Sequence, residues 1–158
     1  MMNLELHVKD ESMTELLAQQ FAQQFDQALV FHLDGDLGAG KTAFVRAFLR
    51  AMGHEGAVRS PTYTLMENYD LKGFEFYHFD LYRLEDPEEL EFIGIRDLDT
   101  SDHTFFIEWP EKGHGAIYDP DIKFFISVAG SGRVFQIAAL TEKGVRLIEK
   151  MDFSSFTE

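Results

Sequence analysis

The sequence contains no cysteine, which excludes disulfide bonds and metal sites built from thiolates. It also lacks any apolar run long enough to cross a membrane. The first residues, MMNLELHVKDE, carry acids where a secretory signal peptide has a basic region and an apolar core. These absences predict a cytoplasmic protein that does not associate with a membrane.

Basic residues are also in short supply. The chain has 14 lysines and arginines against 28 aspartates and glutamates, which gives a formal net charge of −14. Such a chain repels nucleic acid phosphates over most of its surface, so we expect no tight binding of DNA or RNA by this protein alone. A nucleotide is a different ligand, because a metal ion and a few local cations neutralise it. The acidic surface either faces basic partners or serves solubility.

Apolar residues, in contrast, are plentiful: they make up 45% of the 158 residues, and 16 of them are phenylalanines. A chain of this length and composition buries a substantial core. The simplest expectation is a single domain over residues 1–158, in which residues 152–158 form a frayed tail.

One glycine-rich stretch, residues 35–42 (GDLGAGKT), fits the pattern G-x-x-x-x-G-K-S/T. The apolar residues 28–33 predict a buried strand before it, and residues 42–52 predict a largely buried helix after it. Glycines let successive backbone N–H groups turn toward a phosphate, and the helix N-terminus adds partial positive charge. The stretch therefore predicts a phosphate-binding loop.

In such a loop, Lys41 is expected at the β- and γ-phosphates of a nucleotide, and the Thr42 hydroxyl is expected on a Mg²⁺ ion that bridges them. The predicted nucleotide-binding residues here are Asp36, Leu37, Gly38, Ala39, Gly40, Lys41, Thr42 and Ala43.

Two acids follow predicted strands further along the chain. Asp80 comes after the aromatic strand 74–79, and Glu108 follows the apolar run 104–107, as in a Walker B pattern with Glu in place of Asp. Both carboxylates are candidates for the magnesium ion. We favour Glu108 as the closer one, because its more uniformly apolar strand is expected to be more central in the sheet.

The segment between the loop helix and these strands has two interpretations. Its hydroxyl-rich residues either form an ordinary loop that leads into a strand over 63–69, or a switch-like loop that senses the γ-phosphate. Arg83, beyond Asp80, is either a cation of the site or an ion-pair partner of a neighbouring acid. The six histidines have no zinc-binding spacing, and we expect them to be structural. In the second interpretation of the hydroxyl-rich segment, the switch-like loop consists of Ser60, Pro61, Thr62, Tyr63 and Thr64.

Four blocks occur in the order GDLGAGKT, SPTYTL, HFDLYRL and IEWPEKG. With these blocks the sequence closely resembles the TsaE (YjeE) family, the small P-loop ATPases required for threonylcarbamoyladenosine (t6A) modification of tRNA. The likeness extends from Ser12 to about Arg133. It is more specific than the glycine-rich loop alone, because four unrelated blocks agree in order and spacing.

The resemblance implies an α/β fold of the P-loop NTPase type: a mixed sheet with parallel central strands, antiparallel margins and flanking helices. It implies an ATPase that is weak alone and works with TsaB and TsaD. TsaD transfers threonylcarbamoyl to adenosine 37 of tRNA, and the TsaE component resets that complex by hydrolysing ATP. Contact with tRNA is then only indirect, through the complex.

The resemblance also implies roles for individual residues. Lys41 and Thr42 match phosphate- and Mg²⁺-binding positions, and Asp80 and Glu108 match positions that serve the metal and the attacking water. A family threonine near the start of the first helix matches Thr14, and a family Gly-Arg pair matches Gly132 and Arg133. We assign Thr14, with its neighbour Glu11, and Arg133 to the adenosine end of the nucleotide, although residues near a helix start are more often caps.

Three other functions share the loop. A small-molecule kinase needs an acceptor pocket and an arginine-bearing lid, whereas the seven arginines here are dispersed. A GTP switch needs an N-K-x-D segment, which the chain lacks. A nucleotide-gated adaptor would use ATP binding alone, with hydrolysis incidental. Since the sequence offers no clear glutamine to position water and no arginine finger, we expect slow intrinsic turnover until a partner completes the site.

Overall fold

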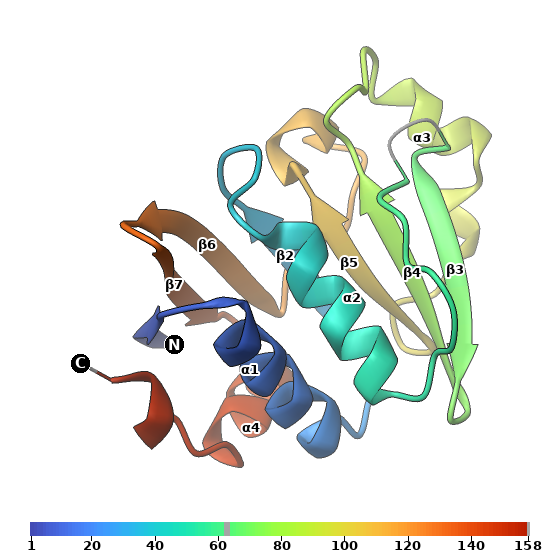
Figure 1. Ribbon diagram of the computed structural model, residues 1–158. Coiled ribbons are helices and arrows are strands. Elements are labelled where there is room, and N and C mark those ends of the chain that lie inside the picture. Colours follow the sequence, from blue (N-terminus) through green and yellow to red (C-terminus); the bar gives the residue numbers. More distant parts are fainter. Residues whose placement is uncertain (62–63, 158) are drawn as a thin grey trace.

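The computed structural model describes residues 1–61 and 64–157. In this part of the chain, a seven-stranded sheet has the order β1-β7-β6-β2-β5-β4-β3, and helices pack on it (Figure 1). The strands are β1 (Met2–Val8), β2 (Val30–Asp34), β3 (Met66–Leu71), β4 (Phe74–Asp80), β5 (His103–Glu108), β6 (Ile122–Ala129) and β7 (Gly132–Ala139). The α-helices are α1 (Glu11–Gln24), α2 (Lys41–Ala51), α3 (Glu88–Phe92) and α4 (Glu142–Glu149). Short 3₁₀ turns are η1 (Ile95–Asp97), η2 (Pro110–Gly113) and η3 (Ser154–Phe156).

The centre of the sheet is parallel and its margins are antiparallel, as predicted. Strand β2 pairs in parallel with β5 and β6, and β5 pairs in parallel with β4. The hairpins β3–β4 and β6–β7 and the pair β1–β7 are antiparallel. Parallel strands end at the same edge of a sheet, so the segments that follow β2, β5 and β4 all meet there.

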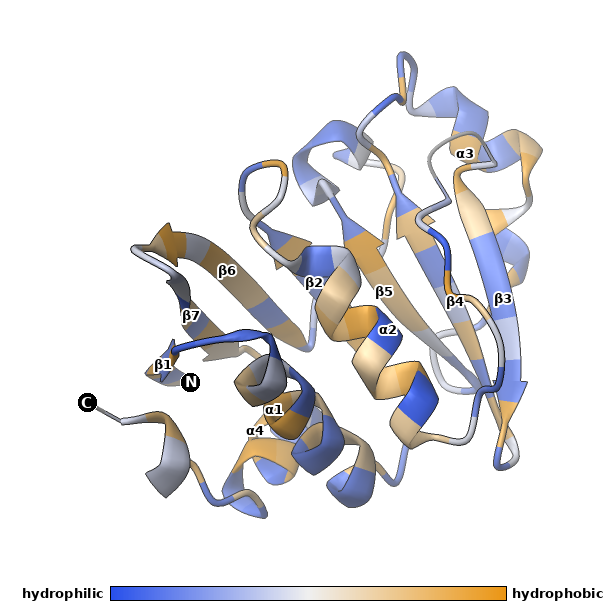
Figure 2. Cartoon of the chain, viewed as in Figure 1, coloured by the Kyte–Doolittle hydropathy of each residue, from blue (hydrophilic) through white to orange (hydrophobic). Residues whose placement is uncertain are grey.

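The order of the strands explains their composition. Strand β5 lies between β2 and β4, whereas β3 is an edge strand. Figure 2 shows β5 as mainly hydrophobic and β3 as mainly hydrophilic, which is the pattern expected of a central and an edge strand. The prediction that Glu108 ends a more central strand than Asp80 is therefore confirmed.

Phenylalanines supply most of the largest fully buried side chains of the core. On the face covered by α1 and α2, rings from both helices and from five strands contact one another, with Phe31 and Phe106 stacked at 4.8 Å between centroids. The opposite face has a smaller cluster around Phe79 and Phe105. Fully buried rings on the larger face include Phe21, Phe44, Phe48, Phe76 and Phe124.

Two expectations about local structure were wrong. The strand expected over 63–69 begins at Met66, because the Leu65 N–H donates to the Pro61 carbonyl in a turn. A frayed tail was expected over 152–158, but residues 152–157 pack against the domain, since Phe156 in η3 is fully buried. Burial of this aromatic ring in the main core stabilises the position of the tail against the domain.

The buried His32 in β2 makes the stability of the fold dependent on pH. Its Nε2–H donates to the Tyr118 carbonyl at 2.9 Å, and burial lowers its pKa below the ordinary 6.5. The unfolded chain therefore takes up a proton near pH 6.5 that the folded chain does not, so stability falls as the pH drops below that value. His32→Gln keeps a hydrogen-bond donor but cannot take up a proton. We expect it to reduce the slope of the free energy of unfolding against pH, between pH 7 and 5, by up to about 1.4 kcal/mol per pH unit, as measured by urea titrations. Parallel curves for the two proteins would contradict this.

Candidate nucleotide site

The glycine-rich loop runs from the end of β2 to the start of α2, and its backbone depends on glycine. Gly35, Gly38 and Gly40 have φ angles of 147°, 78° and 112°, which side-chain-bearing residues rarely adopt. At Gly35 a Cβ would also lie 2.4 Å from the carbonyl oxygen of Ile126 in β6. The first glycine of the motif is thus required by the packing of the loop against the sheet.

This packing predicts an unequal effect of alanine at two glycines. Gly56 also has a positive φ, of 95°, but an added Cβ there meets no atom within 4 Å. We expect Gly56→Ala to cost about 1–2 kcal/mol of stability from backbone strain alone. Gly35→Ala should cost about 1–3 kcal/mol more, because the new methyl group overlaps a backbone carbonyl. Chemical denaturation measures both, and equal losses would refute the close approach of the loop to β6.

Arg133 in β7 supports the loop from the other side. Its Nε donates to the Ala39 carbonyl at 2.9 Å, and Nη2 donates to the Gly38 carbonyl at 3.3 Å. The chain separation of 94 residues means that only the folded sheet can bring these groups together. Arg133 thus satisfies two loop carbonyls and ties the loop to β7.

Lys41, the motif lysine, lies almost fully buried at the start of α2 with 4% of its surface exposed. Its ammonium group donates to the carbonyls of Gly35 and Asp36, and it lies 4.3 Å from the centre of the Trp109 ring. Burial lowers the pKa of Lys41, while the charges of Glu108, Asp80, Asp34 and Glu111 oppose that shift. A cation in this surrounding gains strongly from an additional anion.

Thr42 and Glu108 contact each other directly. The Thr42 hydroxyl donates to the Glu108 carboxylate, at 2.8 Å from Oε2 and 3.0 Å from Oε1. Residues 66 positions apart in the sequence are therefore in one hydrogen bond. Both residues were predicted from the sequence to serve a magnesium ion, and the fold places their side chains in contact.

Asp80 lies next to Glu108 at the end of β4, since the two residues are register partners in the parallel pair. One Asp80 oxygen accepts from the Ser60 hydroxyl at 2.5 Å, and the other accepts from the Tyr82 N–H at 3.1 Å. The predicted switch-like loop thus contacts a predicted metal-serving acid through Ser60. Pro61 is buried, and Thr64 bonds instead to Glu67. Thr62 and Tyr63 lie outside the described residues.

These side chains surround one cavity of about 690 Å³, a size typical of small-molecule sites. Three of its residues were absent from the predicted set: Arg46, Tyr82 and Trp109. Arg46 lies one helical turn after Thr42, so helix periodicity could have indicated it. Tyr82 lies in the turn after β4, and Trp109 directly follows Glu108. Arg83 also lines the cavity. The complete lining is Leu37, Gly38, Gly40, Lys41, Thr42, Ala43, Arg46, Ser60, Asp80, Tyr82, Arg83, Glu108 and Trp109.

Glu11 and Thr14 line a second, smaller cavity of about 300 Å³ together with Gly38, Ala43 and Arg133. The three residues assigned to the adenosine end of a nucleotide are therefore neighbours, on the α1 side of the loop. Ala43 lines both this cavity and the larger one, so the two meet at the start of α2.

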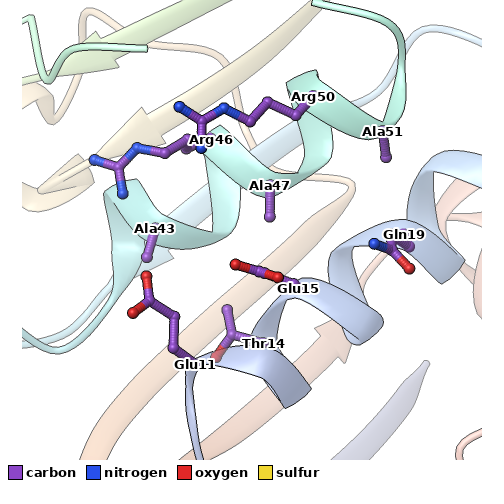
Figure 3. A pocket seen from close by; sticks show the side chains of 9 residues that line it. All are labelled: Glu11, Thr14, Glu15, Gln19, Ala43, Arg46, Ala47, Arg50 and Ala51. Atoms are coloured by element: carbon purple, nitrogen blue, oxygen red, sulfur yellow. The ribbon is translucent and has the colours of Figure 1, made fainter. Parts of the chain in front are cut away.

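A groove of about 350 Å³ continues from there between α1 and α2. Figure 3 shows Ala43, Ala47 and Ala51 of α2 on the side that faces α1, with Glu11 pointing toward Ala43. The small side chains keep the groove open. Glu11 and Thr14 line it as well as the smaller cavity.

The donor set at the end of the sheet fits a magnesium ion held with a nucleotide. Among residues 1–61 and 64–157 there is no group of three or more histidines and acids that forms a complete metal cage. Magnesium needs none, because it is commonly bound by one or two carboxylates with phosphate oxygens and water. The Thr42 hydroxyl and the carboxylates of Glu108 and Asp80 are all oxygen ligands of this kind.

A glycine-rich loop between a central parallel strand and a helix, beside acids at the ends of the next two strands, is the arrangement of a P-loop-type α/β protein. Residues 8–134 match the sequence model of a family described as threonylcarbamoyl adenosine biosynthesis protein TsaE. The chain belongs to this TsaE family.

Individual relatives agree with this assignment. A Haemophilus influenzae protein named tRNA threonylcarbamoyladenosine biosynthesis protein TsaE is 43% identical over 153 residues, which cover 94% of this chain and 97% of the relative. A Rickettsia conorii protein of the same name is 37% identical over 105 residues, and the match spans 66% of this chain and 59% of that longer relative. The crystal structure of Bacillus subtilis YdiB shares the fold, with a TM-score of 0.78 at 24% identity over 94% of this chain and 93% of YdiB. In the described residues, no helix has the length and apolarity to traverse a bilayer.

Proposed function

We propose that this chain binds ATP with Mg²⁺ and hydrolyses it slowly, and that hydrolysis supports t6A modification of tRNA in the cytoplasm by cycling a TsaB/TsaD-type complex. The observation that carries the proposal is the hydrogen bond between Thr42 and Glu108, with the buried Lys41 lining the same cavity. Membership of the TsaE family supports the biological context.

The residues of the cavity have distinct proposed roles. Lys41 exchanges its contacts with loop carbonyls for contacts with the β- and γ-phosphates, and its charge opposes the negative charge that develops during hydrolysis. Thr42 and Glu108 hold the metal, which supplies further neutralisation of the phosphates. Asp80, next to them, orients water for in-line attack and communicates through Ser60 with the switch-like loop. The second cavity, lined by Glu11, Thr14 and Arg133, receives the adenosine.

Slow turnover of the isolated protein is part of the proposal. No glutamine lines the large cavity among the residues that the structure describes, so nothing there resembles a glutamine that positions the attacking water. Arg46 and Arg83 do line it, and a partner that moves either toward the phosphates would complete the site. We expect a turnover number below about 1 s⁻¹ for the isolated chain, under the usual enzyme range. Tens of turnovers per second would contradict the proposal.

A tRNA modification assay tests the biological role. Purified TsaB- and TsaD-type partners from the same source are combined with tRNA, a threonylcarbamoyl donor and this chain, and t6A is counted per complex. We expect several t6A per complex with ATP and at most one with a non-hydrolysable analogue. Repeated turnover with the analogue would favour the nucleotide-gated adaptor, in which hydrolysis is incidental. Phosphate transferred to a small hydroxyl compound instead of water would favour the kinase.

A further inference from the structure

His78 lies beneath the proposed metal-serving residues. It is in β4, two residues before Asp80, so both side chains face the same side of the sheet. The His78 side chain has no exposed surface, and its Nε2 lies 2.5 Å from Oε2 of Glu108, whose side chain is 4% exposed. An ionised carboxylate only accepts, so Nε2 carries the hydrogen and donates it. Glu108 therefore has two donors, His78 below and Thr42 above.

The other ring nitrogen of His78 has an unusual position. Nδ1 is buried and has no hydrogen-bond partner among the described residues. On this face of the sheet, the neighbours of His78 are aromatic: Phe76 lies two residues before it, and Phe106 is its register partner in β5. An apolar side chain would fill this place without an unsatisfied nitrogen. A histidine that served only the core would therefore be a poor choice here.

We propose that His78 is a positioning residue that orients the Glu108 carboxylate toward the cavity. The Nε2–H bond fixes Oε2, and it opposes rotation of the carboxylate about its terminal torsion, which has broad minima when nothing holds it. Both Glu108 oxygens then stay beside the Thr42 hydroxyl at the floor of the cavity, where a cation with the nucleotide needs them. Hydrogen bonds behind a metal ligand commonly determine its orientation and affinity. This inference rests on the proposed nucleotide site.

The test measures the affinity for ATP by calorimetry, once with magnesium and once with EDTA. The ratio of these two affinities is the magnesium-dependent gain, which isolates the contribution of the metal. His78→Leu should keep the affinity in EDTA within about 3-fold and lose about 10-fold or more of the magnesium-dependent gain, as for other residues behind metal ligands. His78→Gln, whose amide N–H replaces Nε2–H, should restore most of the gain. His103→Leu is the matched control: His103 in β5 likewise pairs with an acid of the neighbouring strand, Glu75 of β4, at 2.8 Å, but at the opposite end of these two strands.

A double variant keeps the test decisive if His78→Leu fails to fold. His78→Met also removes the donor, but its flexible apolar side chain fills irregular space in a core, and it should lose the gain in the wild-type background as His78→Leu does. In the Glu108→Gln background, His78→Met should leave what remains of the magnesium-dependent gain unchanged, because His78 acts through Glu108. Independent losses from the two substitutions would overturn the inference. So would a His78→Leu protein with the wild-type gain, or one that loses affinity equally in magnesium and EDTA. A wild-type protein without any magnesium-dependent gain would instead refute the proposed nucleotide site itself.

Discussion

Lys41→Ala is expected to lower the affinity for ATP by at least about 100-fold, which corresponds to about 3 kcal/mol of binding free energy. Lys41 is the cation buried among the loop carbonyls, and the triphosphate would lose its main charged contact with the protein. Calorimetric titration with ATP and Mg²⁺ measures the loss. Lys123→Ala is a matched control, because Lys123 lines a separate cavity with His32 and should change the affinity by less than about 2-fold.

The same substitution should not unfold the protein. Burial lowers the pKa of Lys41, which means that the folded state disfavours its charge. Removing this charge relieves that penalty and offsets the loss of its hydrogen bonds, so we expect an unfolding temperature close to that of the wild type. A near-normal ATP affinity in folded Lys41→Ala would refute the assignment of the loop as the phosphate site.

Glu108→Gln is expected to separate ATP binding from ATP hydrolysis. The amide keeps the size of the carboxylate but removes the charge that we propose holds the metal together with the Thr42 hydroxyl. At millimolar ATP the variant should still be saturated, while its hydrolysis rate falls by about 100-fold or more. It should also fail to sustain repeated t6A formation. Phosphate release and t6A are measured on the same sample.

Glu111→Gln serves as the control for this second prediction. Glu111 lies three residues beyond Glu108 and is exposed in η2, so its charge is near the site without lining the large cavity. Its hydrolysis rate should remain within about 2-fold of the wild type. If Glu108→Gln hydrolysed ATP at the wild-type rate, Glu108 would have no part in the metal site. If it lost hydrolysis but supported repeated t6A formation, the adaptor function would be favoured.

Local features of the site could be predicted from the sequence, because they depend on short-range backbone geometry. The glycines of the loop, Lys41 and Thr42 lie within eight successive residues of one strand–loop–helix unit, so their spacing in the sequence was a sufficient signal. The closeness of Asp80 and Glu108 could be predicted for a related reason. Each acid ends an apolar strand, and neighbouring parallel strands end at the same edge of a sheet.

Contacts between distant segments could not be predicted in the same way. The bond from Arg133 to the loop crosses 94 residues, and the bond from His78 to Glu108 depends on β4 and β5 being neighbours in register. Six histidines without metal-binding spacing gave no reason to single out one of them. The only available signal was the position of His78 two residues before Asp80, which places both on one face of a strand. Phe156 was missed similarly, because its burial depends on the completed core.

The most direct test of the nucleotide site is a calorimetric titration of the wild-type chain with ATP, once with Mg²⁺ and once with EDTA, followed by competition with GTP. We expect saturable binding of ATP at one site per chain, tighter with Mg²⁺ than with EDTA. The affinity for GTP, obtained from the competition, should be lower than the affinity for ATP. Equal competition by GTP would instead favour a GTP switch. No saturable heat with ATP and Mg²⁺ at millimolar concentration would contradict the site formed by Lys41, Thr42 and Glu108, and with it the proposed ATPase.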